Sequence, residues 1–286
     1  MKRLAYFPGC AMKDQARPDE AGTLHALALL GYEIAEIPRW NCCGTVYSLA
    51  QDDLMRHVGP VRNLLRVQGM GEKRVLALCA MCYGTLARSA RFVQEPERLA
   101  RINAFLDTEE DFRGGIGVVH LLTLLRDEVG YEKLPSHVKQ SLNGLKVATY
   151  YGCMLLRPRE FAVDDPDRPE VMERVLEALG AVPVPFPERT ECCGAYLTVG
   201  RKDIVEERVG RILRSARGGG ADLVVTTCPL CQFNLTERRP PEAPPLPVLY
   251  LGQVLGWAFG ADEPTIAALL VGQPTPGEPV SSGGAR

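Results

Sequence analysis

The chain has 286 residues, of which 46% are hydrophobic and 24% are charged, and its formal net charge is −2. This composition is typical of a globular protein, and the length suggests two domains. A nearly neutral chain without a run of lysine or arginine argues against nucleic-acid binding. The first apolar run stops at Pro8, and no stretch of about 18 apolar residues occurs. We therefore expect no signal peptide, no membrane span and a cytoplasmic location.

The first half of the chain alternates short apolar runs with amphipathic segments, as expected for an α/β fold with a parallel sheet. A helix that begins near Pro18 should end at Gly31, because proline suits a first turn and glycine a helix end. Asp53 is a candidate cap for the next helix. Strands are expected at residues 4–7, 32–37 and 74–78, helices at 18–30, 53–65, 85–92, 96–106 and 118–129, a glycine-rich loop at 107–117, and a helix with a linker at 134–144.

The second half repeats this order of elements with small changes in loop length. Its helices should run from Pro169 to Gly180 and from a cap at Asp203 to Gly218. Strands are expected at 146–150, at a proline-interrupted edge position over 182–186, and at 222–226, followed by a proline-rich connector at 240–247 and apolar segments at 248–251 and 254–257. The repeat predicts two similar α/β domains related by a pseudo-twofold axis, each a small parallel sheet with flanking helices, at residues 1–144 and 145–271, and a disordered tail at 272–286.

All ten cysteines fall into two matching sets. The first set has the spacing Cys-x31-Cys-Cys-x35-Cys-x2-Cys, and the second has Cys-x38-Cys-Cys-x34-Cys-x2-Cys. The first set is Cys10, Cys42, Cys43, Cys79 and Cys82, and the second is Cys153, Cys192, Cys193, Cys228 and Cys231. Because the carboxyl ends of parallel strands meet at one edge of a sheet, three turns can bring each five sulfurs to one point.

Five thiols in each half favour an iron–sulfur cluster over the other roles of paired cysteines. Zinc needs four ligands, a thioredoxin-like pair leaves the adjacent cysteines unused, and a chain of this length does not need five disulfides. A cubane cluster also needs four ligands, so the fifth cysteine implies an unusual cluster or a reactive thiol. Gly44 and Gly194 let the backbone approach a bulky centre. Helix amino termini, whose dipoles stabilise thiolates, are expected beside Cys43, Cys82, Cys193 and Cys231.

The short sequences around the cysteines resemble those of one known family, and the resemblance runs from about residue 4 to residue 260. Two Cys-Cys-Gly motifs flanked in this way are similar to the cysteine-rich CCG domain, present twice. The local sequences resemble the B subunit of heterodisulfide reductase (HdrB) at Tyr6-Phe7-Pro8-Gly9-Cys10, Cys79-Ala80-Met81-Cys82-Tyr83, Tyr151-Gly152-Cys153-Met154-Leu155-Leu156-Arg157-Pro158 and Cys228-Pro229-Leu230-Cys231-Gln232-Phe233-Asn234-Leu235.

The resemblance implies a cofactor, a reaction and partners. Each five-cysteine set would bind one noncubane [4Fe-4S] cluster, which accounts for the fifth ligand. In the family, electrons pass from a flavin-containing subunit of the HdrA type through a ferredoxin-like subunit of the HdrC type, and the two clusters cleave a disulfide. This chain has no ferredoxin-like cysteine run and no dinucleotide fingerprint, so it would need such partners.

Three hypotheses follow from the sequence. The first is the catalytic HdrB-type subunit of a heterodisulfide-reductase-like complex, an oxidoreductase that reduces or forms a disulfide. The second is an electron-transfer subunit of a lactate or glycolate oxidase or of a quinone-linked dehydrogenase. The third is a zinc-stabilised scaffold without a redox role. Metal analysis separates the third from the others, and disulfide turnover separates the first two.

Overall fold

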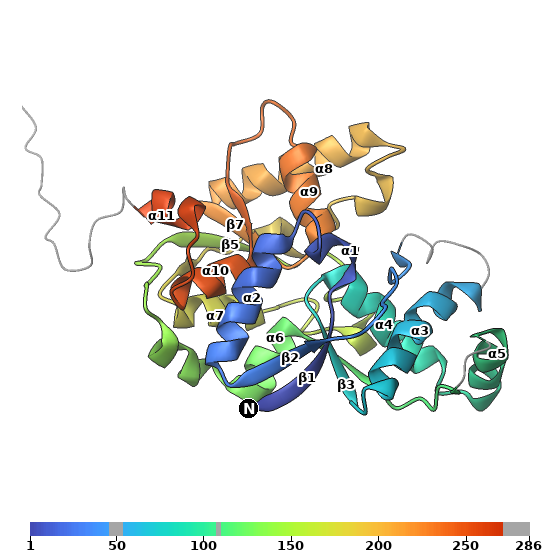
Figure 1. Ribbon diagram of the computed structural model, residues 1–286. Helices are drawn as coiled ribbons and strands as arrows, with labels where there is room; N and C mark the ends of the chain where they lie inside the picture. Colours follow the sequence, from blue (N-terminus) through green and yellow to red (C-terminus); the bar gives the residue numbers. More distant parts are fainter. Residues whose placement is uncertain (46–53, 107–109, 271–286) are drawn as a thin grey trace, which may run out of the picture.

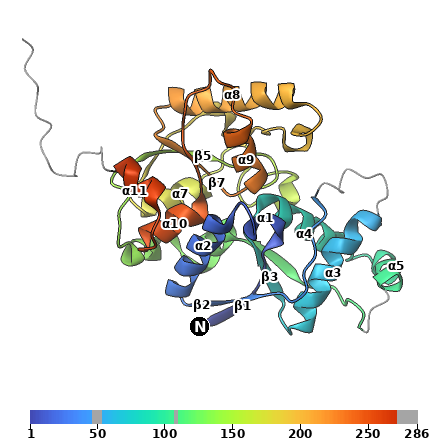
Figure 2. The same ribbon diagram turned by 45° about the horizontal axis from the view of Figure 1, so that its top comes forward.

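The fold consists of two parallel four-stranded sheets with flanking helices, in a computed structural model that describes residues 1–45, 54–106 and 110–270 (Figures 1 and 2). The strand order is β2-β1-β3-β4 in one sheet and β6-β5-β7-β8 in the other. Each half of the chain builds one sheet, so the predicted pair of similar α/β domains is confirmed. Among the described residues, no helix has both the length and the apolar character needed to cross a membrane.

The first half contributes the sheet at the amino-terminal end of the chain. Its strands are β1 (Lys2–Phe7), β2 (Tyr32–Glu36), β3 (Arg74–Ala77) and β4 (Gly117–His120). Its helices are α1 (Gly9–Met12), α2 (Arg17–Leu29), α3 (Met55–Gly69), α4 (Ala80–Phe92), α5 (Pro96–Leu106) and α6 (Leu121–Leu124), followed by a π-helical turn at Leu125–Val129 and a 3-10 helix at Tyr131–His137.

The second half repeats the first, strand for strand. Its strands are β5 (Lys146–Tyr150), β6 (Val182–Pro183), β7 (Leu223–Thr226) and β8 (Val248–Tyr250). Its helices are α7 (Val171–Ala178), α8 (Lys202–Gly218), α9 (Pro229–Glu237), α10 (Leu251–Ala258) and α11 (Pro264–Leu270), with short 3-10 turns at Arg159–Phe161, Pro187–Thr190 and Ala195–Leu197. The proline-interrupted strand lies at the sheet edge, as predicted.

Several local predictions need correction. The expected helix over 118–129 begins only at Leu121, because Val118 and Val119 pair with Val75 and Leu76 of β3 as strand β4. β-branched residues favour such a half-buried strand. The helix α8 begins after Arg201, which places Asp203 in its first turn rather than at its cap. The predictions for Asp53 and for the tail from residue 272 lie outside the described residues.

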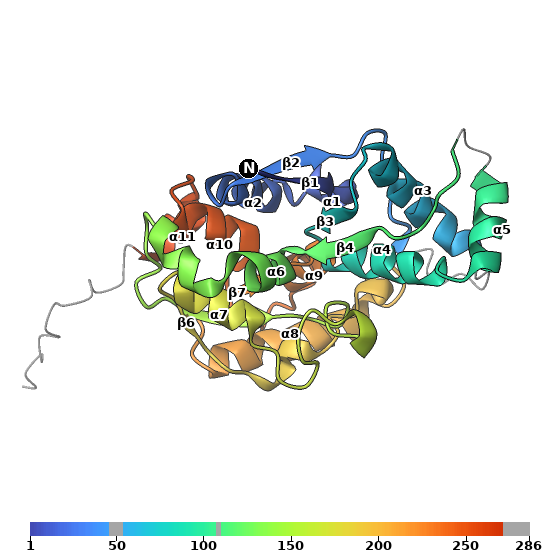
Figure 3. The ribbon, with the colours of Figure 1, turned by 90° about the horizontal axis from the view of Figure 1, so that it is seen from below.

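In each half, the helix that follows the fourth strand packs against the other half. Helix α10 packs along α2 of the first half, and α6 with the following 3-10 helix packs against α7 of the second half (Figure 3). Glycines make the α2–α10 contact close: a Cβ atom on Gly22 would lie 2.2 Å from the carbonyl oxygen of Gly252, and one on Gly256 would lie 2.4 Å from Gly22 Cα. The two backbones therefore touch, as small residues at helix crossings allow.

A buried carboxyl group lies inside the same contact. Asp19 is 2% exposed, and its Oδ1 accepts a hydrogen bond from the Gly252 backbone N–H at 2.8 Å. Burial raises the pKa of Asp19 to about 8, because a charge between two packed helices loses its hydration. Its neighbour Glu20 raises that pKa further through like-charge repulsion. The helix contact therefore carries a group that binds a proton more tightly in the folded state than in the unfolded state.

We expect the Gly252→Ala variant to loosen the contact between the halves. The added Cβ would lie 2.1 Å from Thr23 Oγ1 and 2.4 Å from the Asp19 carbonyl oxygen, so one helix must shift. The free energy of unfolding should fall by about 1–3 kcal/mol, measured by urea denaturation. Gly69→Ala is the matched control, because no atom lies within 4 Å of its added Cβ and it ends helix α3. Equal stability of the two variants would contradict the close packing.

The Asp19→Asn variant should change how stability depends on pH. The folded-state pKa is raised from 3.8 to about 8, so the stabilisation from the bound proton is complete below the lower value and is lost as pH rises toward the upper one. In that window the wild type should lose up to about 1.4 kcal/mol per pH unit relative to the variant, whose amide oxygen still accepts from Gly252. Urea denaturation of both proteins at several pH values measures the difference, and parallel profiles would refute it.

Candidate metal centre

The strand order creates a switch point in each sheet, and the cysteines lie at it. In the first sheet the chain leaves β1 toward β2 and then returns past β1 to β3, so the connections diverge between β1 and β3. Ligands of open α/β sheets bind at the carboxyl ends of such strands. Cys10 follows β1 and Cys79 follows β3, while Cys153 follows β5 and Cys228 follows β7.

The sulfurs within each set lie in contact. Cys82 Sγ lies 3.4 Å from Cys43 Sγ, and the equivalent pair Cys193 and Cys231 lies 3.6 Å apart. The remaining thiols lie close enough to shift one another's pKa, in the pairs Cys10 and Cys42, Cys42 and Cys43, Cys79 and Cys82, Cys153 and Cys192, and Cys228 and Cys231. The structure therefore brings each predicted set together.

The two sets also meet each other. The thiols of Cys79 and Cys228 interact across the boundary between the halves, which lowers the pKa of Cys79 and raises the pKa of Cys228. Each of these residues precedes a helix as its N-cap, Cys79 for α4 and Cys228 for α9. The switch points of the two sheets therefore face each other, and the two thiol sets meet at Cys79 and Cys228.

Neighbouring groups lower the pKa of the first cysteine in each adjacent pair. The Cys153 thiol lowers the pKa of Cys192 to about 6, helped by the backbone N–H of Gly194, whose nitrogen lies 3.3 Å from the sulfur. In the first half the Cys10 thiol and the Gly44 N–H lower the pKa of Cys42 well below its usual value. A thiolate is the form of cysteine that binds metal.

The glycines after the adjacent cysteine pairs orient backbone N–H groups toward the sulfurs, whereas the helix predicted beside Cys193 is wrong. Gly44 and Gly194 have φ values of 75° and 84°, which turn their N–H groups toward the sulfurs. Cys82 and Cys231 lie in first helical turns as predicted, but Cys193 does not precede an α-helix. A single 3-10 turn follows it, since the chain must bend at Gly194. The helix start expected beside Cys43 stays a prediction, because residues 46–53 lie outside the described part of the chain.

The group of thiols fits a multi-metal cofactor in donor type and in the room left for sulfur. A Cβ atom on Gly9 would lie 2.9 Å from Cys82 Sγ, and one on Gly152 would lie 3.2 Å from Cys231 Sγ, so both positions need glycine. Cys10 and Cys42 are exposed, whereas the pairs that follow β3 and β7 are buried. Within residues 1–45, 54–106 and 110–270, no group of three or more His, Cys, Asp or Glu side chains is arranged around a single metal ion.

Hydroxyl and amide groups next to the sulfurs differ between the halves, and the sequence analysis missed them. Thr45 Oγ1 lies 3.3 Å from Cys43 Sγ and 2.9 Å from Thr85 Oγ1. In the second half Asn234 Nδ2 donates to Cys193 Sγ at 3.5 Å and to the Cys193 carbonyl at 3.2 Å. Thr85 and Asn234 both stand three residues after the last cysteine of their set, a correspondence that the internal repeat could have revealed.

His120 supports the backbone at Cys79 rather than adding a ligand. Its Nδ1 accepts from the Leu122 N–H at 3.2 Å, so Nε2 carries the proton and donates to the Leu78 carbonyl at 3.0 Å. Burial lowers the pKa of His120 to about 4, which keeps the ring neutral. Its position at the end of β4, beside β3, follows from the strand that sequence analysis assigned to a helix.

Comparison with known proteins identifies the family of both halves. The cysteine-rich domain family CCG matches residues 4–87 and 147–236. The chain is 34% identical to the 8-methylmenaquinol:fumarate reductase membrane anchor subunit of Wolinella succinogenes, over 91% of this chain and 93% of that one. It is 30% identical to the B subunit of a ferredoxin/F420H2-dependent CoB-CoM heterodisulfide reductase of Methanosarcina acetivorans, over 91% and 90% of the two chains.

Two further comparisons agree with these. A protein of Archaeoglobus profundus that is described as similar to the B subunit of heterodisulfide reductase is 30% identical over 95% of both chains. The fold is similar to that of a hypothetical protein from Helicobacter pylori, with a TM-score of 0.73 and 13% identity over 93% of this chain and 51% of that one. Both halves and their cysteine motifs therefore place the chain in one family: it belongs to the cysteine-rich CCG domain proteins, in the group of HdrB-type subunits of heterodisulfide reductase.

Proposed function

We propose that the chain is the iron–sulfur, HdrB-type subunit of a heterodisulfide-reductase-like oxidoreductase. The contact between Cys79 and Cys228, which joins two equivalent thiol sets at facing switch points, is the observation that carries the proposal. Cys10, Cys42, Cys43, Cys79 and Cys82 would hold one noncubane [4Fe-4S] cluster, and Cys153, Cys192, Cys193, Cys228 and Cys231 would hold the other. Such clusters supply one-electron transfer when bound.

The residues of this chain hold, orient and shield the sulfurs. The N–H groups of Gly44 and Gly194 stabilise thiolates at Cys42 and Cys192, and the buried turns after β3 and β7 keep the inner sulfurs away from water. Cleavage of one disulfide consumes two electrons and two protons and yields two thiols. Two sets in contact suit such a two-electron reaction, because both can act on one bond held between them.

The electrons would come from partner subunits. Relatives are named as the B subunits of ferredoxin-dependent heterodisulfide reductases, which supports a complex with a ferredoxin-like subunit of the HdrC type and a flavin-containing subunit of the HdrA type. Cys10 and Cys42 are the exposed thiols of the two sets, so electrons from a partner subunit would enter on their side of the molecule.

A second candidate function has support of its own. The relative from Wolinella succinogenes is named for a quinol-dependent fumarate reductase, and it is 34% identical to this chain over nearly its whole length. The same two thiol sets could then pass electrons between a quinol and a partner enzyme. Turnover of a disulfide by the purified complex supports the first function, and turnover of a quinol without disulfide reduction supports the second.

The test of the proposal uses Cys43→Ser and Cys193→Ser, one inner ligand from each half. Anaerobically purified wild type should carry about eight iron atoms with matching sulfide, and each variant about half of that. Each variant should lose nearly all disulfide reduction, measured with a reduced viologen as electron donor, because one thiol set alone cannot deliver both of the electrons that the disulfide needs.

Two outcomes would contradict this prediction. Zinc at about one ion per half, in place of iron, would remove the cluster assignment and support a structural scaffold. A variant could lose the EPR signal of one cluster and still keep most of its disulfide reduction. That result would show that the thiol set without its cluster does not take part in the reaction. The two variants serve as controls for each other, because they occupy equivalent positions in the repeat.

A further inference from the structure

We propose that Asn234 is a positioning residue that raises the reduction potential of the cluster at the second thiol set and so makes the two sets unequal. The inference rests on the proposed function, because it concerns the iron–sulfur groups that the two sets would hold. Asn234 Nδ2 donates to Cys193 Sγ at 3.5 Å and to the Cys193 carbonyl oxygen at 3.2 Å. Thr85, at the equivalent position of the first half, donates to the Met81 carbonyl oxygen instead.

The neighbours of Asn234 fix the orientation of its amide. A carbonyl oxygen only accepts hydrogen bonds, so the amide atom that lies 3.2 Å from the Cys193 carbonyl oxygen is the nitrogen. On the other side of the amide, the Thr198 hydroxyl donates to Asn234 Oδ1 at 2.8 Å. The Asn234 side chain is fully buried, so water does not compete for these hydrogen bonds. The amide therefore presents its N–H groups to Cys193 and its oxygen to Thr198.

The first half has hydroxyl groups where the second half has the amide. The Thr85 hydroxyl donates its proton to the Met81 carbonyl oxygen at 2.8 Å. The Thr45 hydroxyl lies 3.3 Å from Cys43 Sγ, but it also lies 2.9 Å from Thr85 Oγ1. The Met81 carbonyl oxygen, at 3.4 Å, is a third acceptor for the same Thr45 proton. The Cys43 sulfur therefore competes with two oxygens for one hydroxyl proton, whereas the Cys193 sulfur lies next to an amide nitrogen that carries two protons.

A hydrogen bond to a ligand sulfur acts on the reduction potential because reduction adds negative charge to a cluster and its sulfurs. A donor stabilises the reduced form more than the oxidised form, so the reduction potential rises. The effect is stronger away from water, and Cys193 is 1% exposed. Bonds to the Cys193 carbonyl oxygen and to Thr198 would be enough for a purely structural asparagine. The further bond to Cys193 Sγ gives Asn234 a role in the reduction potential.

The first experiment is an EPR-monitored redox titration of the purified holo complex. The Cys43→Ser and Cys193→Ser variants assign the signals, because each should keep only the cluster of the other set. In Asn234→Thr, the ratio of reduced to oxidised second-set cluster at a fixed potential should fall about tenfold, or about 59 mV for a one-electron couple. A threonine in a helix donates to the carbonyl four residues earlier, as Thr85 does, and so leaves the sulfur without its donor. The potential of the first-set cluster should stay unchanged.

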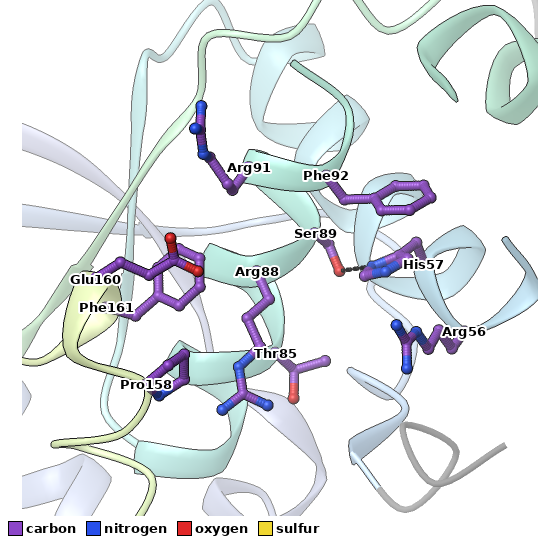
Figure 4. Close-up of a pocket in the computed structure, with 10 residues that line it drawn as sticks. All are labelled: Arg56, His57, Thr85, Arg88, Ser89, Arg91, Phe92, Pro158, Glu160 and Phe161. Atoms are coloured by element: carbon purple, nitrogen blue, oxygen red, sulfur yellow. Dashed lines mark hydrogen bonds between the residues drawn. The ribbon is translucent and has the colours of Figure 1, made fainter. Parts of the chain in front are cut away.

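The reciprocal variant, Thr85→Asn, places an amide at the equivalent position of the first half. Thr85 lines a cavity of about 290 Å³ beside α3 and α4, whose walls also include Arg56, Arg88 and Arg91 (Figure 4). The larger side chain therefore has room without overpacking the core. We expect the potential of the first-set cluster to rise in this variant, with the second-set cluster unchanged, because the new amide is placed to donate to Cys43 Sγ.

A second variant tests the same hydrogen bond from a position that is only partly buried. Thr198→Val removes the hydroxyl that holds Asn234 Oδ1, so the amide is less fixed and the second-set potential should fall by less than in Asn234→Thr. Thr236→Val is the matched control, because the Thr236 hydroxyl donates to the Gln232 and Phe233 carbonyl oxygens of its own helix. It should leave both potentials unchanged.

The outcomes separate this inference from the proposed function. If the clusters reduce no disulfide but the second-set potential falls in Asn234→Thr and Thr198→Val, the proposed function fails and the role of Asn234 stands. If a disulfide is reduced and Asn234→Thr keeps its iron and both potentials, the role of Asn234 is overturned. If Asn234→Thr loses the iron of the second set, an unchanged second-set potential in Thr198→Val overturns it. Zinc in place of iron overturns both.

Discussion

The backbone contact between α2 and α10 sets the distance between the two sulfur groups. Gly22, Gly252 and Gly256 leave no side chain between these helices, so the halves approach as closely as two backbones can. Helix α10 begins directly after β8, beside the strand that delivers Cys228. Any side chain at this crossing would displace β8 and β7 relative to the first sheet, and with them the contact between Cys228 and Cys79.

The sequence predicted the sheets and the cysteine sets because the relevant signals are local. Short apolar runs ending in Cys10, Cys79, Cys153 or Cys228 identify central strands, and a parallel sheet has only one edge where such turns can gather. Strand β4 was missed because it has four residues, of which only His120 is fully buried, so its pattern merges with the helix that follows. The repeat predicted two domains related by a pseudo-twofold axis, but it did not identify α2 and α10 as the helices that meet, because spacing within a repeat does not say which helices of its copies touch.

The two halves have the same fold but different chemistry around the sulfurs. Thr85 and Asn234 occupy equivalent positions in the repeat. The Thr85 hydroxyl contacts the Thr45 hydroxyl, whereas the Asn234 amide donates an N–H to Cys193 Sγ. An N–H or O–H donor to a metal-binding sulfur withdraws electron density and changes the potential of the bound group. The repeat therefore supplies two similar thiol sets, and single side chains next to them make the two sets unequal.

The same inequality extends to the surface. Only the first set has two exposed thiols, whereas Cys153 and Cys192 are half-buried, and the arginine-lined cavity lies on the α3–α4 side of the first half with one wall from the second. A symmetric pair of domains would offer the same face twice. Exposure and hydrogen bonding therefore differ between the halves, so the two thiol sets have the same fold around them but different surroundings.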